Sequence, residues 1–474
     1  MKIHFIGIGG IGVSALARYY LSQAESHQVS GSDLTESEIT KSLEKLGTKI
    51  NIGKHQSQNL PKDTNLVVYS PAITNDNPEL VMAFKENIPC QSYPENLGQL
   101  TKDHFTIAVA GTHGKGTTTA MISLILIKAK LDPTVIIGTK LKEFGNSNFR
   151  LGKKFGYKIQ NTKYKILVIE ADEYKSSFLN YCPTIIVLTC IDKDHLDYFK
   201  NLTNIIKTFR KFINHLPKNG TLIANKKDVN TKKTLNDKYK IPETKYQTKF
   251  YPTAQKDIIE LKQILKLPGN HILADALAAL TLARILKIKD KVSFKALSEY
   301  QGAWRRFEQK KIKISGANGK TINLINDYAH HPTEIEVTLK AARQKYPKQK
   351  ITCVYQPHQY QRTFYLFKDF VKVLAKAQID QLILTDIYSV SGRESAELKK
   401  KVSSKKLVSA ISKKQNTKYK IQNTKTLYIP TLKETTQYLK KNLKSNEILI
   451  IMGAGNVYNL EELLTEKQRK AKIK

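Results

Sequence analysis

The chain has 474 residues, of which 41% are hydrophobic, so it is long enough for about two to four domains with sizeable cores. No apolar run is long enough to span a bilayer, and the four cysteines lack metal-ligand spacing, so we expect a cytoplasmic protein with reduced thiols. The net charge of +37 comes almost entirely from lysine spread along the chain, whereas arginine, which reads bases, is sparse; we therefore expect solvated lysine-rich faces and no specific nucleic-acid partner.

Short apolar strands alternate with helical patterns along most of the chain, which predicts an α/β fold built on parallel sheets. The apolar N-terminus could pass for a signal peptide, but its four glycines favour a strand, a turn and a helix. We place boundaries near residues 103 and 300. They predict three domains, of residues 1–102, 103–299 and 300–474.

The first glycine-rich turn follows the apolar strand Lys2–Ile8. Gly7, Gly9 and Gly12 form a G-x-G-x-x-G pattern that opens a helix, and Asp33 follows at the distance of a ribose-binding acid. Such a turn lets the backbone approach a diphosphate at the helix N-terminus. By itself the pattern also fits an NAD-dependent dehydrogenase or a tight turn without a ligand.

The second glycine-rich turn, Gly111–Thr119 (GTHGKGTTT), follows the strand Phe105–Ala110 and opens an apolar helix. Backbone N–H groups of such a turn hold phosphates, Lys115 neutralises their charge, and a hydroxyl reaches Mg²⁺. Val109 stands where a strict P-loop has its first glycine. The strand, turn and helix together still predict a site for a nucleoside triphosphate.

Two acidic clusters follow buried-type strands after this turn. Glu170-Ala-Asp172-Glu173 ends one strand, and Asp192-Lys-Asp194-His195-Leu-Asp197 follows the next. Either cluster alone would be an ordinary solvated turn or helix cap. Because both come at strand ends after a phosphate-binding turn, they predict a magnesium site.

A third group of polar residues lies at strand ends in the last part of the chain. Arg305 and Arg306 come first, then the segments Asp327–Glu334 (DYAHHPTE) and Gln356–Arg362 (QPHQYQR). Arginines there can stabilise a transferring phosphoryl group or hold a carboxylate substrate. The paired histidines do not indicate zinc, since no further ligands occur at zinc spacing.

In their order, these motifs resemble the Mur ligases over nearly the whole chain. The segments that carry the resemblance include IGIGGIGVSALA, SGSDL, AGTHGKGTTTAM, IEADE, DKDHLDYF, DYAHHPTEI and QPHQYQRT. The resemblance implies a UDP-sugar-binding Rossmann-like domain, a central P-loop ATP-binding domain and a Rossmann-like C-terminal domain that binds an amino acid. It implies an ATP-dependent ligase that joins L-alanine to UDP-N-acetylmuramate through an acyl phosphate, for peptidoglycan synthesis. A UDP-sugar-binding homologue with weakened catalysis, or a ligase for another amino acid or peptide, stays open.

The resemblance also implies roles for individual residues, with ATP and Mg²⁺ as cofactors. The catalytic residues would be Lys115, Arg306, Asp327, His330 and Arg362. ATP would be held by Gly111, Thr112, His113, Gly114, Lys115, Gly116, Thr117 and His271. UDP-N-acetylmuramate and alanine would be held by Gly9, Gly10, Gly12, Ser14, Asp33, Ser70, Ala72, Tyr328 and His358. The metal ligands would be Thr117, Glu170 and His195.

Several positions depart from the pattern of the family. Gly116 stands where a threonine or serine usually follows the P-loop lysine, and we therefore expect Thr117 to supply the metal-binding hydroxyl. The other departures are Ile272 and Asp275 in place of two asparagines, Cys190 after Thr189, Lys175 in place of an aspartate and Gln359 in place of an arginine.

Three related lysine-, asparagine- and tyrosine-rich segments occupy residues 158–166, 238–249 and 414–426. They are too few and too unevenly spaced for a solenoid. We expect polar insertions in surface loops, where added length costs little.

Overall fold

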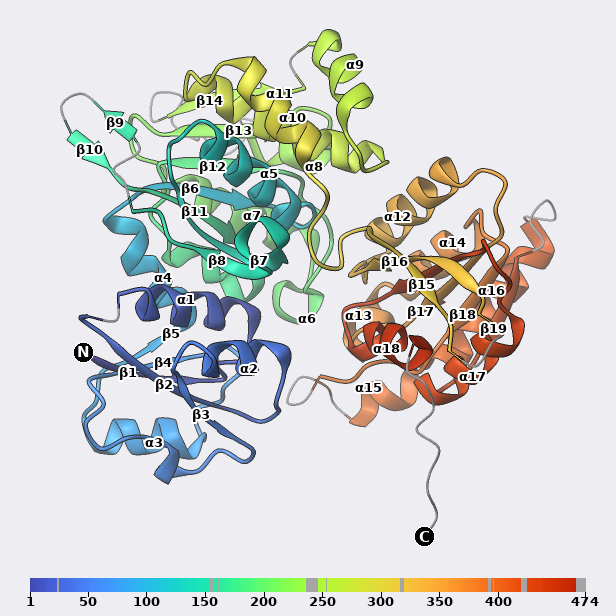
Figure 1. The fold of residues 1–474 in the computed structure, drawn as a ribbon, viewed down its shortest axis with the longest axis horizontal. Coiled ribbons are helices and arrows are strands. Elements are labelled where there is room, and N and C mark those ends of the chain that lie inside the picture. The colour runs from blue at the N-terminus through green and yellow to red at the C-terminus, as the bar shows by residue number, and fades with distance from the viewer. Residues whose placement is uncertain are drawn as a thin grey trace. The chain divides into compact units, whose positions relative to one another are not determined.

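The computed structural model describes residues 1–23, 25–153, 157–159, 162–235, 246–252, 254–315, 319–390, 394, 396–418 and 424–465. The chain divides into two compact units. The first comprises Met1–Lys193, Asn201–Lys266 and Leu273–Tyr300, and the second comprises Asp194–Lys200, Leu267–Ile272 and Gln301–Lys474. Three sheets of five, seven and six strands organise the described residues, two of them in the first unit (Figure 1).

The five-stranded sheet is parallel throughout, with the order β3-β2-β1-β4-β5. Its strands are β1 (Lys2–Ile6), β2 (Gln28–Asp33), β3 (Lys49–Ile52), β4 (Leu66–Tyr69) and β5 (Cys90–Ser92), and its helices are α1 (Ile11–Leu21), α2 (Glu38–Glu44), α3 (Pro78–Lys85) and α4 (Tyr93–Lys102). Ile6, Val67 and Leu80 are fully buried in its core. The strand order reverses between β1 and β4, and ligands of such sheets bind beyond the carboxyl ends of the strands at that point.

The seven-stranded sheet has the order β14-β13-β12-β6-β11-β7-β8, and β8 alone runs antiparallel to its neighbour. Its strands are β6 (Phe105–Ala110), β7 (Thr134–Leu141), β8 (Ser147–Arg150), β11 (Ile166–Ala171), β12 (Ile185–Leu188), β13 (Thr221–Asn225) and β14 (Gln247–Tyr251). The central strands β6, β11 and β12 are largely apolar runs, as expected where helices cover both faces of a parallel sheet.

The helices around this sheet include α5 (Lys115–Lys128), α7 (Leu202–Ile213), α8 (Val229–Leu235), α9 (Gln255–Ile264), α10 (Asn270–Ile285) and α11 (Asp290–Glu299), with the short α6 (Leu196–Phe199). Helix α5 packs against β7, β11 and α11, and most of its residues are buried. This burial agrees with its apolar sequence, which has no polar stripe.

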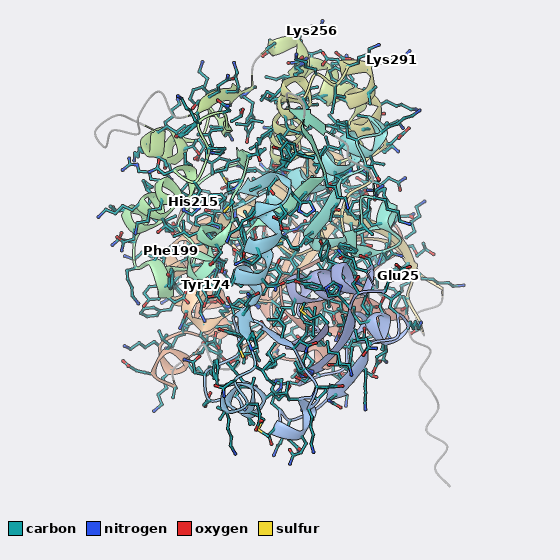
Figure 2. All side chains as sticks on the ribbon, turned by 90° about the vertical axis from the view of Figure 1, so that its left-hand side faces the viewer. Glu25, Tyr174, Phe199, His215, Lys256 and Lys291 are labelled. Atoms are coloured by element: carbon teal, nitrogen blue, oxygen red, sulfur yellow. The ribbon has the colours of Figure 1, made fainter. Side chains whose placement is uncertain are left out.

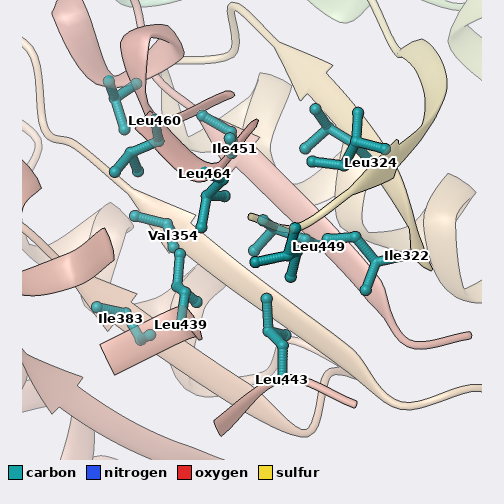
Figure 3. Packing of buried hydrophobic residues seen from close by; sticks show 13 residues of the cluster. Ile322, Leu324, Val354, Ile383, Leu439, Leu443, Leu449, Ile451, Leu460 and Leu464 are labelled. Atoms are coloured by element: carbon teal, nitrogen blue, oxygen red, sulfur yellow. The ribbon is translucent and has the colours of Figure 1, made fainter. Parts of the chain in front are cut away.

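The six-stranded sheet belongs to the second unit and has the order β15-β16-β20-β17-β18-β19. Its strands are β15 (Glu308–Lys313), β16 (Thr321–Asp327), β17 (Ile351–Tyr355), β18 (Gln381–Leu384), β19 (Lys425–Tyr428) and β20 (Ile448–Met452). Its helices are α12 (Pro332–Lys345), α13 (Tyr360–Tyr365), α14 (Phe367–Ala375), α15 (Ala396–Lys401), α16 (Ser404–Lys418), α17 (Leu432–Asn442) and α18 (Leu460–Thr465). Leu439 of α17 and Leu460 of α18 pack with Val354 and Ile451 of the strands (Figure 3).

Lysine side chains cover much of the surface. Lys256 and Lys291, for example, extend into solvent from α9 and α11 (Figure 2). This placement agrees with the interpretation of the charge as solvated faces. Within the described ranges, no helix is both long and apolar enough to cross a membrane.

The first lysine-rich segment forms two short antiparallel strands, β9 (Tyr157–Ile159) and β10 (Thr162–Tyr164). Most of the second, residues 238–245, lies outside the described residues, as do residues 419–423 of the third. The described part of the third segment is divided between the end of α16 and β19.

Candidate functional site

The first glycine-rich turn connects β1 to α1 at the carboxyl edge of the five-stranded sheet. Gly7 has a φ of +77°, and its N–H donates to Ser32 O at 2.9 Å. A Cβ on Gly7 would lie 3.0 Å from the Cβ of Ser70, so the turn passes close to the end of β4. The N-cap residue Gly10 has no side chain to cap α1, so the first N–H groups of the helix are available to an anion such as a diphosphate.

The Asp33 carboxylate closes this turn. Its Oδ2 accepts a hydrogen bond from Gly9 N at 2.8 Å, and a Cβ on Gly9 would lie 2.9 Å from the same oxygen. Beside it, Ala72 N donates to Ser70 Oγ at 3.3 Å. Asp33, Ser70 and Ala72, which the sequence predicts at a nucleotide-sugar site, therefore all lie around one turn.

Ser14 anchors the first turn of α1. Its hydroxyl donates to Ile11 O at 3.0 Å and accepts from Asn148 Nδ2 at 2.9 Å, and the serine is fully buried. Asn148 belongs to β8 of the seven-stranded sheet, and its amide also donates to Ile11 O. The predicted substrate residue Ser14 is thus a contact between the two sheets of the first unit.

The second glycine-rich turn follows β6, the strand at the middle of the seven-stranded sheet. Gly111 has a φ of +137°, and a Cβ there would lie 2.0 Å from Thr189 Oγ1, so only glycine fits. Gly114, with a φ of +79°, precedes α5, which no side chain caps. The N–H groups at the start of α5 are therefore available to a phosphate.

The Lys115 ammonium lies inside this turn. Its Nζ donates to Gly111 O and to Glu173 Oε2, each at 2.7 Å. Burial opposes its charge, but the carboxylates of Glu173, Asp172 and Glu170 raise the pKa of Lys115 above its usual range. A phosphate that binds the turn therefore meets a charged lysine.

The threonines at the start of α5 differ in their hydrogen bonds. Thr118 donates to Asp275 Oδ1 at 3.1 Å, and Thr119 donates to Lys115 O at 2.9 Å. The Thr117 hydroxyl makes no hydrogen bond to any residue that the structure describes. Thr117 is thus the threonine whose hydroxyl is available to a metal ion.

Glu170 ends β11 beside this helix. Its Oε2 accepts from Gly138 N at 2.8 Å, while its Oε1 has no donor among the described residues. A Cβ on Gly116 would lie 3.3 Å from Glu170 Oε2, so a larger residue at position 116 would press on this carboxylate. The glycine that departs from the family pattern therefore accommodates Glu170.

The acidic segment after β12 divides between the two units. Asp192 belongs to the first unit, where its Oδ2 lies 3.1 Å from His113 Nε2 and its N–H donates to Thr112 Oγ1 at 2.9 Å. Asp194 and His195 belong to the second unit. The predicted metal ligands Glu170 and His195 therefore lie in different units.

In the second unit, Asp194 forms a buried ion pair with Arg362 of α13. Arg362 Nε donates to Asp194 Oδ1 at 3.0 Å and Nη2 donates to Oδ2 at 3.3 Å. Burial would raise the pKa of Asp194, but the Arg362 charge and the neighbouring histidines hold it well below its usual range. Arg362 Nη1 also donates to His358 O at 3.4 Å, so the ion pair fixes the loop that carries His358.

Asp327 ends β16 as a buried acid. Its oxygens accept from Phe307 N at 2.9 Å and Ala329 N at 2.7 Å. Burial raises the pKa of Asp327 to about 6, although the neighbouring Arg306 opposes this shift. The Arg306 guanidinium lies 5.0 Å from the centre of the Tyr328 ring, so these predicted residues do come together.

Arg305, unlike Arg306, is buried as a structural group. Its guanidinium lies 4.5 Å from the ring centre of Tyr458 and 4.9 Å from that of Tyr328. It donates to the backbone oxygens of Gly453 and Gly455. Arg305 thus connects the segment before β15 with the loop after β20.

The rings of His330 and His358 lie next to each other in the second unit. Their ring centres are 5.9 Å apart, and His358 stacks on Tyr388 with a centre distance of 5.6 Å. His330 Nδ1 lies 3.1 Å from Tyr328 O, which can only accept, so Nδ1 carries the proton. Burial lowers the pKa of His330 to about 3, so the ring is neutral at pH 7 and Nε2 keeps its lone pair.

His271 also belongs to the second unit, apart from the other predicted ATP residues. Its Nδ1 is buried without a hydrogen-bond partner in the described part of the chain. Burial lowers the pKa of His271 to about 4, against the opposing effect of Glu334. A buried ring nitrogen without a partner is a candidate contact for a polar ligand.

Comparison with known proteins extends these local observations to the whole chain. Family models match residues 2–105 (Mur ligase family, catalytic domain), 109–283 (Mur ligase middle domain) and 305–455 (Mur ligase, glutamate ligase domain). The chain belongs to the Mur ligase family. The UDP-N-acetylmuramate–L-alanine ligases of Clostridium acetobutylicum and Acetivibrio thermocellus are each 38% identical to it over 98% of its length, and 98% and 96% of those proteins are covered.

The crystal structure of a UDP-N-acetylmuramate–alanine ligase from Thermotoga maritima superposes on this Mur ligase with a TM-score of 0.74. The two are 25% identical, with 98% of this chain and 97% of that chain covered. The predicted three-domain α/β fold and the predicted membership of the family are therefore confirmed.

Three side chains of this Mur ligase lie at the site although their sequence context does not indicate it. Glu173 was noted only as a member of an acidic cluster, yet it binds the P-loop lysine. In the sequence, Asp275 only stands in place of an asparagine of the family. In the structure its carboxylate lies against the P-loop turn, since a Cβ on Gly114 would lie 2.5 Å from its Oδ1. No sequence signal marked Asn148, because its partners are more than 100 residues away.

Proposed function

We propose that this Mur ligase joins L-alanine to the carboxylate of UDP-N-acetylmuramate, with conversion of ATP to ADP and phosphate. The observation that carries the proposal is its 38% identity, over 98% of the chain, to ligases that bear this name. The uncapped helix N-termini of α1 and α5, at two glycine-rich turns, support one site for a diphosphate and one for a triphosphate.

The chemistry requires an activated carboxylate, because its oxygen is a poor leaving group. The γ-phosphoryl group of ATP passes to the muramoyl carboxylate, which releases ADP and forms an acyl phosphate. The amine of alanine then attacks the acyl carbon, and phosphate leaves as the amide forms. Lys115 is placed to neutralise the charge on the transferring phosphoryl group.

Thr117 and Glu170 are suited to hold Mg²⁺. One offers a hydroxyl and the other a carboxylate oxygen, neither of which has a protein partner among the described residues. Bound magnesium would neutralise phosphate charge and orient the phosphates for transfer. His195 remains a proposed ligand from the second unit.

The second unit is the proposed site of the amino acid. The amine of alanine attacks through its lone pair, and His330 Nε2, neutral and with its own lone pair, is suited to accept a hydrogen bond from that amine and to orient it. With a pKa of about 3, His330 is too weak a base to take the proton of the alanine ammonium. Arg306, Tyr328, His358 and Arg362 would hold the alanine carboxylate and the phosphate, with Asp327 positioning Arg306.

The proposed domains are residues 1–102 for the nucleotide sugar, 103–299 for ATP and 300–474 for the amino acid. A cytoplasmic location, where ATP is available, follows from the same proposal.

Phosphate release tests the function. Purified protein with ATP, Mg²⁺ and UDP-N-acetylmuramate should release phosphate only when L-alanine is added, and glycine and L-serine should support roughly 10–200-fold lower kcat/KM. Turnover that prefers another amino acid or a peptide would favour a different family ligase. Tight binding of the nucleotide sugar without turnover for any of them would favour a binding protein.

A further inference from the structure

Tyr93 stands at the junction between the two sheets of the first unit. It is the first residue of α4, the helix that connects β5 to β6 (Figure 1). Its ring packs directly on Gly12 in the first turn of α1, since a Cβ on Gly12 would lie 2.9 Å from Tyr93 Cζ and 3.0 Å from its hydroxyl oxygen. The third glycine of the pattern therefore makes room for this tyrosine.

Carboxylates at the acidic edge of the seven-stranded sheet act electrostatically on the Tyr93 hydroxyl. Burial, together with the nearby carboxylates of Glu170 and Asp172, raises the pKa of Tyr93 above its usual range. The hydroxyl therefore remains a hydrogen-bond donor at neutral pH. It lies 3.0 Å from the position of a Cβ on Gly12, in the turn proposed for the nucleotide sugar.

No residue in the described ranges forms a hydrogen bond with the Tyr93 hydroxyl. A phenylalanine would fill the same space against Gly12, so packing alone does not explain why this residue has a hydroxyl group. A polar group that a ligand covers is costly unless the ligand itself provides a partner. The adjacent first turn of α1 is uncapped, so the group expected to bind there is negatively charged.

We propose that the Tyr93 hydroxyl donates a hydrogen bond to the diphosphate of the nucleotide-sugar substrate. The inference rests on the proposed function for the identity of that substrate. The N–H groups of α1 hold the diphosphate from one side, and Tyr93 supplies a side-chain donor from the side of Glu170. Tyr93 is thus a binding residue that fixes the diphosphate, which joins the uridine to the sugar whose carboxylate reacts.

Calorimetric titration of Tyr93→Phe tests this contact without any need for turnover. A hydrogen bond to a charged group is worth a factor of roughly 10 to 100 in affinity. We expect the Kd values of UDP-N-acetylmuramate and of UDP to rise by that factor, while the Kd of UMP, which lacks the diphosphate, and the Kd of ATP stay unchanged. The melting temperature should also stay unchanged, since no internal hydrogen bond is lost.

Tyr20→Phe is the matched control. Tyr20 is a buried tyrosine of α1, the helix that Tyr93 packs against, but its hydroxyl donates to Asn96 Oδ1 at 2.9 Å. This variant should lose stability and keep the affinity for UDP.

The two proposals fail in different ways. If Tyr93→Phe binds UDP-N-acetylmuramate and UDP like the unchanged protein, the contact does not exist. If only UDP-N-acetylmuramate is weakened, the hydroxyl contacts the sugar and the assignment to the diphosphate is wrong. If the unchanged protein binds no UDP-sugar, the proposed function fails instead.

Discussion

Single side chains decide where a phosphate and a metal can bind in the first unit. Lys115 donates to the backbone of its own turn and to Glu173, so it is held in place before any nucleotide arrives. Among the threonines that follow, Thr118 and Thr119 already have acceptors. The metal site therefore depends on which hydroxyl the fold leaves available.

Replacement of Thr117 by alanine should separate a metal ligand from a helix-start residue. Loss of a ligand should raise the Mg²⁺ concentration needed for half-maximal activity and lower kcat by roughly a hundredfold, with normal melting. Thr117→Ser should restore both values. Thr118→Ala is the control, since it loses only the hydrogen bond to Asp275. An unchanged Mg²⁺ titration in Thr117→Ala would show that water, and not this hydroxyl, completes the site.

Glu79 should make the stability of the protein depend on pH. It is fully buried in the five-stranded sheet domain, where its carboxylate binds His4, Ser32, His55 and Asn59. Burial opposes its charge, but these hydrogen bonds lower the pKa of Glu79 from 4.5 to about 2. The stabilisation is therefore fully present above pH 4.5, amounts to roughly 3 kcal/mol, and is lost as pH falls toward 2.

Urea unfolding of Glu79→Gln across this pH range checks the expectation. The difference in unfolding free energy between the unchanged protein and the variant should shrink between about pH 5 and pH 2. A difference that stays constant over this range would mean that Glu79 has an ordinary pKa in the folded state.

For the helices and strands, the motifs predicted where strands end, but they did not predict which distant side chains form hydrogen bonds with one another. The two glycine-rich turns and the acidic end of β11 lie where apolar strands end. The pattern of apolar residues in the sequence is sufficient to predict these positions. The bonds from Gly9 to Asp33 and from Asn148 to α1 depend on packing between distant segments, which local spacing does not encode. The same limit explains why Asp194 was grouped with Asp192 although it pairs with Arg362.

Strand β8 should influence the nucleotide sugar through Asn148. This side chain binds Ser14 and Ile11 in the first turn of α1, whose N–H groups are proposed to hold the diphosphate. Asn148→Ala should raise the KM for UDP-N-acetylmuramate several-fold, leave the KM for ATP unchanged and cost about 1–2 kcal/mol of stability. Steady-state kinetics with each substrate varied in turn measures the effect. Equal KM values in both proteins would limit Asn148 to packing.

In the whole molecule, the residues proposed to bind the nucleotide sugar and those proposed to bind alanine belong to different units. Both glycine-rich turns, the second of which is the P-loop, belong to the first unit, and the cluster around Asp327, His330 and Arg362 belongs to the second. A variant in this cluster should therefore change the use of alanine and spare the binding of ATP.

Arg362→Ala tests this separation. Removing one member of a buried ion pair leaves the Asp194 charge uncompensated and typically costs about 3–5 kcal/mol. We expect a lower melting temperature, a higher KM for alanine and a lower kcat, with an unchanged Kd for ATP by titration. Arg362→Lys should regain part of the stability and less of the activity, because lysine lacks the bidentate geometry. Unchanged kcat and alanine KM in Arg362→Ala would remove this residue from the proposed amino-acid site.

The order of the strands also relates the lysine surplus to solubility, because lysine within the strands occurs mainly on the outermost ones of the sheets. The outermost strand of a sheet exposes unpaired N–H and C=O groups, which can recruit a strand of another molecule and start aggregation. Four of the six outermost strands of the three larger sheets, β3, β14, β15 and β19, carry lysine, whereas only two of their twelve interior strands, β1 and β7, do. Lysine at these borders repels a second copy of the chain, so the protein should stay dispersed at low ionic strength and lose some of that protection as salt screens the charge.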